Sequence, residues 1–126
     1  MKLVNPYADG TRGWLKGQLH LHTTRSDGAD TAEDVVRHYE ALGYDFIAFT
    51  DHNTVPNPED LAIPTSMLLL PGQEYRCARE SGDQELGVVG TADALPADLG
   101  HRDYIDAALA SGAFVIYNHP SWHIHH

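Results

Sequence analysis

Cysteine and long apolar runs are scarce in this sequence. Cys77 is the single cysteine, which excludes an intrachain disulfide and favours a reducing compartment. The first residues contain no apolar core of the roughly 7–15 residues that a secretory signal needs. No segment approaches the roughly 18–20 consecutive apolar residues of a membrane span. These absences predict a cytoplasmic protein with no membrane partner.

Positive charge is scarce as well. The 126 residues include 8 lysines and arginines against 18 aspartates and glutamates, a formal net charge of -10. General nucleic-acid binding needs a basic surface, so this balance argues against it. A phosphorylated substrate remains compatible with it, because bound divalent cations reverse the local charge. Histidine, by contrast, is abundant, with nine residues that a function has to explain.

The hydrophobic pattern predicts one α/β domain over residues 1–126, with a mostly parallel sheet. Alternating apolar and polar residues over 15–22 predict a first strand with His20 and His22 on one face. A capping box at Thr31 and a stop at Gly43 predict a helix over 31–42. The pattern also predicts strands at 46–50, 67–70, 86–90 and 113–117, a helix at 102–111, and a loop with one helical turn at 53–65.

Residues of the types that bind metals, histidine, aspartate and glutamate, follow each of the main predicted strands. In chain order they are His20, His22, Asp27, His52, Glu74 and His119. Sites in parallel α/β folds form where the strands end, so these side chains are expected to meet. Imidazole and carboxylate ligands suit zinc, manganese or iron, and two histidines on one strand face can bind one ion.

Each of these residues also has an ordinary alternative role. The two histidines could be half-exposed strand residues, His52 a loop cap, Glu74 a solvated acid and His119 part of a turn. Their shared position at strand ends favours a common site. Three other polar residues are not interpreted as metal ligands. Asp51 is expected to support the site or cap a helix, His38 to lie on the surface, and His101 to start a helix.

Four segments resemble motifs of the PHP (polymerase and histidinol phosphatase) family of metal-dependent phosphoesterases. They are LHLHTTRSDG, FTDHNT, LLLPGQE and VIYNHP, and the resemblance runs from Leu15 to Pro120. It is greatest for small stand-alone members, which include nucleotide phosphoesterases and related carbamate or ester hydrolases. The resemblance implies a distorted (β/α)7 barrel, similar to a TIM barrel, that holds two or three divalent ions such as Zn, Mn or Fe.

The resemblance also implies a ligand for each ion. His20, His22 and Glu74 would hold one ion, Glu74 would bridge to a second held by His119, and Asp27 with His52 would hold a third. The sequence departs from the family pattern at two places. Glu85 stands where many relatives have a histidine, and a late Asp-x-His pair is not reached before His126.

Length indicates an incomplete barrel. An eight-unit barrel takes about 200–250 residues, so a seven-unit barrel is expected to lack its C-terminal part here. The sheet edge after Tyr117 would then be open, unless another copy of the chain covers it as a homo-oligomer. His123, His125 and His126 are either substitute ligands or an incidental tail, and the tail is the favoured interpretation.

The predicted chemistry is hydrolysis of a small phosphate ester by a metal-activated hydroxide. His119 or Glu74 would position this hydroxide, and Arg25 is the first candidate to bind the anionic group, followed by Arg76 and Arg79. Each arginine could equally be a surface residue. Two alternatives are a carbamate or carboxylic ester hydrolase and a non-catalytic remnant that binds metal. A zinc amidohydrolase is disfavoured because no lysine follows the second predicted strand.

Overall fold

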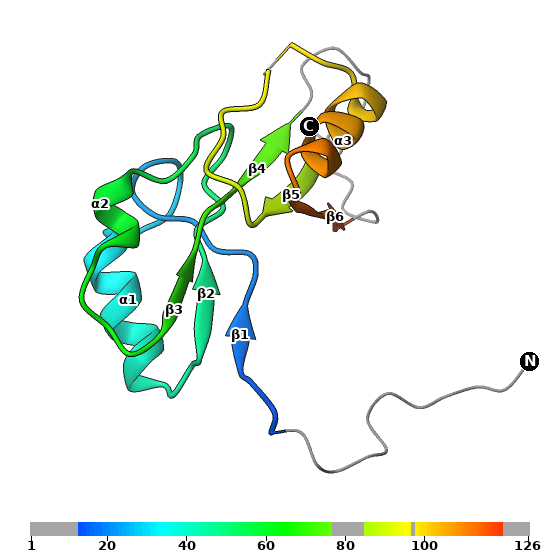
Figure 1. The fold of residues 1–126 in the computed structure, drawn as a ribbon. Helices are drawn as coiled ribbons and strands as arrows, with labels where there is room; N and C mark the ends of the chain where they lie inside the picture. The colour runs from blue at the N-terminus through cyan, green and yellow to red at the C-terminus, as the bar shows by residue number, and fades with distance from the viewer. Residues whose placement is uncertain (1–12, 77–84, 97, 120–126) are drawn as a thin grey trace, which may run out of the picture.

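The computed structural model of the chain describes residues 13–76, 85–96 and 98–119. Within these ranges it contains six strands and three helices, arranged as two three-stranded sheets (Figure 1). Cys77, Arg79 and the three C-terminal histidines lie outside the described residues. No helix in the described part of the chain is both long and apolar enough to cross a membrane.

The first sheet is parallel and consists of β1 (Gly17–Gln18), β2 (Phe46–Ala48) and β3 (Leu68–Leu70), in that order. The helix α1 (Ala32–Ala41) connects β1 to β2, which gives the predicted βαβ unit. The strand predicted over 15–22 is much shorter in the structure. The Gln18 side chain accepts hydrogen bonds from the Leu19 and His20 amides, so the backbone leaves the regular ladder after Gln18.

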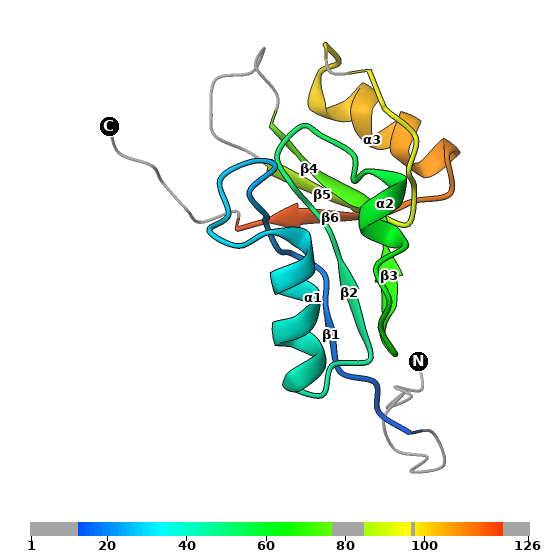
Figure 2. The ribbon, with the colours of Figure 1, turned by 90° about the vertical axis from the view of Figure 1, so that its left-hand side faces the viewer.

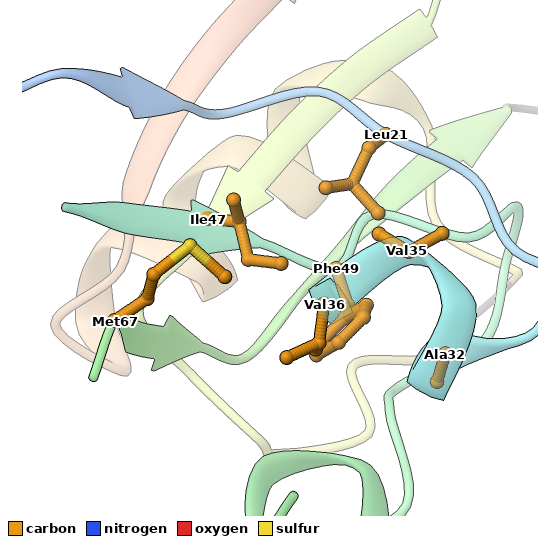
Figure 3. Packing of buried hydrophobic residues seen from close by; sticks show 7 residues of the cluster. All are labelled: Leu21, Ala32, Val35, Val36, Ile47, Phe49 and Met67. Atoms are coloured by element: carbon orange, nitrogen blue, oxygen red, sulfur yellow. The ribbon is translucent and has the colours of Figure 1, made fainter. Parts of the chain in front are cut away.

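The helix α1 begins and ends close to its predicted bounds. The Thr31 hydroxyl accepts a hydrogen bond from the Asp34 amide at the N-cap. Gly43 follows the helix with φ +72, a conformation that glycine adopts without strain. One face of α1 packs on the first sheet (Figures 2 and 3). The resulting core consists of Leu21, Ala32, Val35, Val36, Ile47, Phe49 and Met67.

The second sheet is antiparallel and consists of β4 (Gly72–Arg76), β5 (Glu85–Val89) and β6 (Phe114–Asn118). The expectation of a mostly parallel sheet was therefore wrong for this half of the chain, and the described residues do not confirm a barrel. The cause is β4, which the sequence did not predict. Its polar residues Gln73 and Glu74 are buried, whereas a polar segment in a sequence normally indicates an exposed loop.

The helix α3 (His101–Ala110) packs against the second sheet (Figure 1). Its Tyr104 ring stacks on Tyr75 of β4, with ring centroids 3.5 Å apart and an interplanar angle of 5°. The rest of this second core consists of Leu86, Val88, Ala108 and Ala113. The short helix α2 (Pro58–Leu61) is the helical turn expected within 53–65.

The two sheets join through the segment that follows β2. His52 forms a parallel bridge with Glu74 of β4. The Glu74 amide donates to the Asp51 carbonyl at 3.1 Å, and the Asn53 amide donates to the Glu74 carbonyl at 2.8 Å. This pairing places the end of the first sheet directly beside the start of the second.

Candidate metal centre

The seven residues predicted as metal ligands lie together where the two sheets meet. They are His20, His22, Asp27, His52, Glu74, Glu85 and His119. The first four come from the segments after β1 and β2, and the other three from β4, β5 and the end of β6. Their convergence is a finding of the structure, whereas metal binding by each residue stays a prediction.

Glu74 is the centre of this cluster. Its side chain is 1% exposed, and four imidazoles surround its carboxylate. Its Oε2 lies 2.9 Å from His22 Nε2, 3.2 Å from His20 Nε2 and 3.4 Å from His52 Nδ1. Its Oε1 lies 3.2 Å from His119 Nε2. A carboxylate with nitrogen donors at both oxygens is well placed to bridge two cations.

Asn118 fixes the orientation of Glu74, and sequence reasoning gave it no role. Its Nδ2 donates to Glu74 Oε1 at 2.7 Å. Burial alone would raise the pKa of Glu74, but the hydrogen bonds from His20 and Asn118 and the nearby imidazole charges lower that pKa to about 2. The same hydrogen bond with Glu74 raises the pKa of His20. Glu74 is therefore ionised at neutral pH, the state in which a carboxylate can bind a cation. Its position beside His119 was the only sequence signal for Asn118.

A second group forms around Asp27 in the loop after β1. Asp27 Oδ1 lies 2.6 Å from His22 Nδ1, and its Oδ2 lies 3.4 Å from His52 Nε2. The hydrogen bond with His22 lowers the pKa of Asp27. Each of the two imidazoles thus faces Asp27 with one ring nitrogen and Glu74 with the other.

Buried Asp51 holds this loop in place, which agrees with its expected supporting role. Its carboxylate accepts hydrogen bonds from the Thr23 amide at 2.8 Å, the Thr23 hydroxyl at 2.9 Å and the Ser26 hydroxyl at 2.6 Å. Gly28 completes the turn, because a Cβ atom there would clash with the His22 carbonyl. The loop is thereby folded back onto His22, a candidate metal ligand.

Glu85 lies on the other side of the cluster and is 4% exposed. Its Oε2 is 3.3 Å from His119 Nε2, and its Oε1 is 3.7 Å from His52 Nδ1. Arg76, directly opposite on β4, binds the same Oε1 through Nε at 2.7 Å and Nη2 at 2.6 Å. Glu85 therefore carries its own counter-ion.

Arg25 is not part of the cluster's contacts. Its Nε lies 2.6 Å from Asp60 Oδ2 and its Nη2 lies 2.8 Å from Asp60 Oδ1, a bidentate pair with a buried carboxylate of α2. Of the other two histidines considered, His38 is largely exposed and faces Asp30, and His101 is the first residue of α3, as expected.

The residues fit a divalent metal. Three groups within the described residues offer ligand atoms that all lie within 4.8 Å of one another. The groups are His20–Glu74–His119, His22–Asp27–His52 and His52–Glu74–Glu85. Buried His52 Nδ1 has no hydrogen-bond partner among the residues that the structure describes, and the Nε2 atoms of His20 and His22 lie 3.2 Å apart. Bound cations would satisfy both, because neutral imidazole nitrogen is a good ligand for zinc and similar ions.

Comparison with solved structures identifies similar folds. A two-domain protein from Bacteroides vulgatus, described as containing a predicted PHP-like metal-dependent phosphoesterase, matches with a TM-score of 0.65 and 24% identity. The match covers 86% of this chain and 36% of that one. A protein from Bifidobacterium adolescentis, described as a metal-dependent phosphoesterase, matches with a TM-score of 0.50 and 26% identity, over 59% of this chain and 27% of that one.

Sequence comparison gives the family. The DNA polymerase/3'-5' exonuclease PolX of Bacillus subtilis is 37% identical over 54 residues, which are 40% of this chain and 10% of that protein. The chain thus spans only a small part of the length of these relatives. The PHP domain family matches residues 18–118, a range that contains six of the seven cluster residues and ends one residue before His119. This match confirms the resemblance of the four motifs, and the chain therefore belongs to the PHP domain family.

Proposed function

We propose that this chain carries the metal centre of a hydrolase that cleaves small phosphate esters, within the distorted barrel of its family. The observation that supports this proposal best is the convergence of four imidazoles and three carboxylates, with the buried carboxylate of Glu74 at the centre. The descriptions of the two similar structures as metal-dependent phosphoesterases favour the same reaction.

The proposed centre holds two or three ions of zinc, manganese or iron. His20, His22 and Glu74 hold one, His119 with Glu74 and Glu85 holds a second, and Asp27 with His52 holds a third. Bound ions of this kind supply an activated water at neutral pH and neutralise the charge on the phosphoryl oxygens.

The protein side chains position the reactants. His119 Nε2 faces two carboxylates at 3.2 and 3.3 Å, which hold its ring in place so that it can help position the attacking water. Glu74 shares this orienting role. Arg25 ties the Asp27 loop to α2 through its ion pair with Asp60, and its role as the first candidate to bind the anionic substrate stays a prediction.

Parallel assays of one purified sample test this function. The chain is loaded with Mn²⁺ or Zn²⁺ and offered an aryl phosphate and an aryl carbamate ester. We expect metal-dependent release from the phosphate ester, and a loss of at least about a hundredfold in His20→Ala and Glu74→Gln, because each removes a ligand. His38→Ala is the matched control, since this exposed imidazole contacts only Asp30 among the residues described.

The outcomes separate the alternatives. Metal-dependent cleavage of the carbamate ester alone would support the metal centre and refute phosphate-ester hydrolysis as its reaction. Tight metal binding without hydrolysis of either ester would indicate a non-catalytic metal-binding protein. Full activity in folded His20→Ala would refute the site itself.

A further inference from the structure

Arg76 and Glu85 form a cation–carboxylate pair within the candidate metal centre. They are direct cross-strand partners on β4 and β5. Both Nε and Nη2 of Arg76 point to the same carboxylate oxygen, Oε1, at 2.7 and 2.6 Å. Glu85 is buried, whereas the Arg76 side chain is 46% exposed. The other oxygen, Oε2, faces His119. One side of Glu85 is therefore bound by a fixed cation and the other side faces the site.

This arrangement distinguishes one ligand group from the other two. Glu85 belongs to the group His52–Glu74–Glu85, and its Oε2 also faces His119, which the proposal above assigns to the same ion. Among the described residues, no lysine or arginine forms an ion pair with a carboxylate of the other two groups, and Arg25 in the same loop pairs with Asp60 instead. Of the ions proposed for the centre, only the one bound at Glu85 would therefore have a ligand carboxylate that is also paired with a guanidinium.

Two physical effects oppose ion binding at this carboxylate. The guanidinium and a divalent ion repel each other across a few ångströms, an interaction that water screens only in part at a buried carboxylate. The two N–H donors also occupy lone pairs of Oε1, which leaves Oε2 as the free ligand atom. The same hydrogen bonds keep the Glu85 side chain in a fixed orientation while no ion is present.

We propose that Arg76 acts as an internal counter-cation that weakens divalent-ion binding at Glu85 and makes that ion the most weakly held of the centre. This inference rests on the proposed metal centre and adds to it a residue that sets how readily one ion exchanges. Arg76 touches none of the other candidate ligands among the contacts described, so it is a positioning residue and not itself a ligand.

Calorimetric titration of the metal-free chain with Mn²⁺ tests the proposal. In Arg76→Gln we expect the dissociation constant of the weakest Mn²⁺-binding step to fall about tenfold, because the repelling charge is removed while a hydrogen-bonding amide remains. Arg76→Lys keeps the charge and should stay within about threefold of the unchanged protein. Arg37→Gln removes the exposed pair with Asp34 and is the matched control, with no change in any step. Glu85→Gln should abolish the weakest step alone.

An unchanged or weaker last step in folded Arg76→Gln would overturn the proposal, and so would retention of all steps in Glu85→Gln. Failure of the unchanged protein to bind any Mn²⁺ would refute the proposed metal centre together with this inference. If ions bind but Arg76→Gln leaves the weakest step unaltered, the inference alone is wrong.

A measurement on the unchanged sequence covers the case in which Arg76→Gln does not fold. The Arg76 Nε–H resonance is followed by NMR while diamagnetic Zn²⁺ is added. We expect it to shift in parallel with the last, weakest step, since an ion at Glu85 withdraws charge from Oε1. A resonance that moves only with the first step, or with none, contradicts the proposal.

Discussion

Replacing Glu74 by glutamine in the metal-free chain gives a direct test of how the centre is held without ions. Burial raises the pKa of this carboxyl, but hydrogen bonds from His20 and Asn118 and nearby imidazole charge lower it from 4.5 to about 2. A lowered folded-state pKa stabilises the protein above the unfolded value, and that contribution is lost as the pH falls through the folded value.

The size of the effect follows from the lowering of the Glu74 pKa from 4.5 to about 2. One unit of pKa corresponds to about 1.4 kcal/mol, so this shift contributes about 3 kcal/mol to the free energy of unfolding. We therefore expect Glu74→Gln to be about 3 kcal/mol less stable than the unchanged chain near pH 5. This difference should close as the pH falls toward 2, because protonated glutamate and glutamine are then alike.

His20 sets the upper end of the same pH window. Its hydrogen bond with Glu74 raises the pKa of its imidazole above 6.5. A raised histidine pKa contributes stability below 6.5 that is lost as the pH rises through the folded value. The difference in the free energy of unfolding between the unchanged chain and Glu74→Gln should thus also decrease as the pH rises above 6.5. This decrease should be absent when His20→Ala is compared with the double variant that carries both His20→Ala and Glu74→Gln.

The assay is urea unfolding followed by circular dichroism, at half-unit steps from pH 2 to 9, after the metal has been removed by dialysis. Titrating groups that do not interact with Glu74 act in both proteins and cancel in the difference. If the free energies of unfolding of the unchanged chain and of Glu74→Gln differ by the same amount at every pH, Glu74 is not held by its imidazole neighbours.

Three further substitutions follow from local structure. Thr31→Ala removes the N-cap of α1 and should cost about 1 kcal/mol in urea unfolding, with no change in metal affinity. Ile47→Ala opens a cavity in the first core, where Ile47 is 0% exposed, and should cost about 2–5 kcal/mol; a smaller loss would mean that the core is loosely packed. Gly28→Ala should displace the Asp27 loop through its clash with the His22 carbonyl and weaken Zn²⁺ binding, whereas an unchanged affinity would show that the loop adapts.

The parts of the fold that were predicted correctly are those with a strong local signal. The helix α1 has a cap, an apolar stripe and a terminal glycine, and β2 and β6 are apolar runs of strand length. Each of these signals arises within one segment of the chain. The candidate ligands were found for the same reason, since they directly follow apolar segments.

The parts that were missed depend on partners distant in the sequence. The strand β4 contains buried Gln73 and Glu74. Its backbone pairs with β5 and with the segment after β2, and the Glu74 carboxylate accepts a hydrogen bond from Asn118. Antiparallel pairing of β5 with its two neighbours is likewise set by tertiary contacts. No local pattern showed that Arg25 would pair with Asp60, 35 residues away.

The position of the candidate centre at the junction of the sheets would couple the proposed metal binding to both halves of the fold. Two of the three ligand groups, His20–Glu74–His119 and His52–Glu74–Glu85, take residues from both sheets. In the metal-free chain the junction depends on the backbone pairing around His52 and on Glu74 held among its imidazoles. Because an ion bound by either group contacts both sheets at once, separating them would require losing that ion, so binding must stabilise the junction. The Asp27 group lies within the first sheet's segments alone, and an ion there would order its loop without joining the two halves.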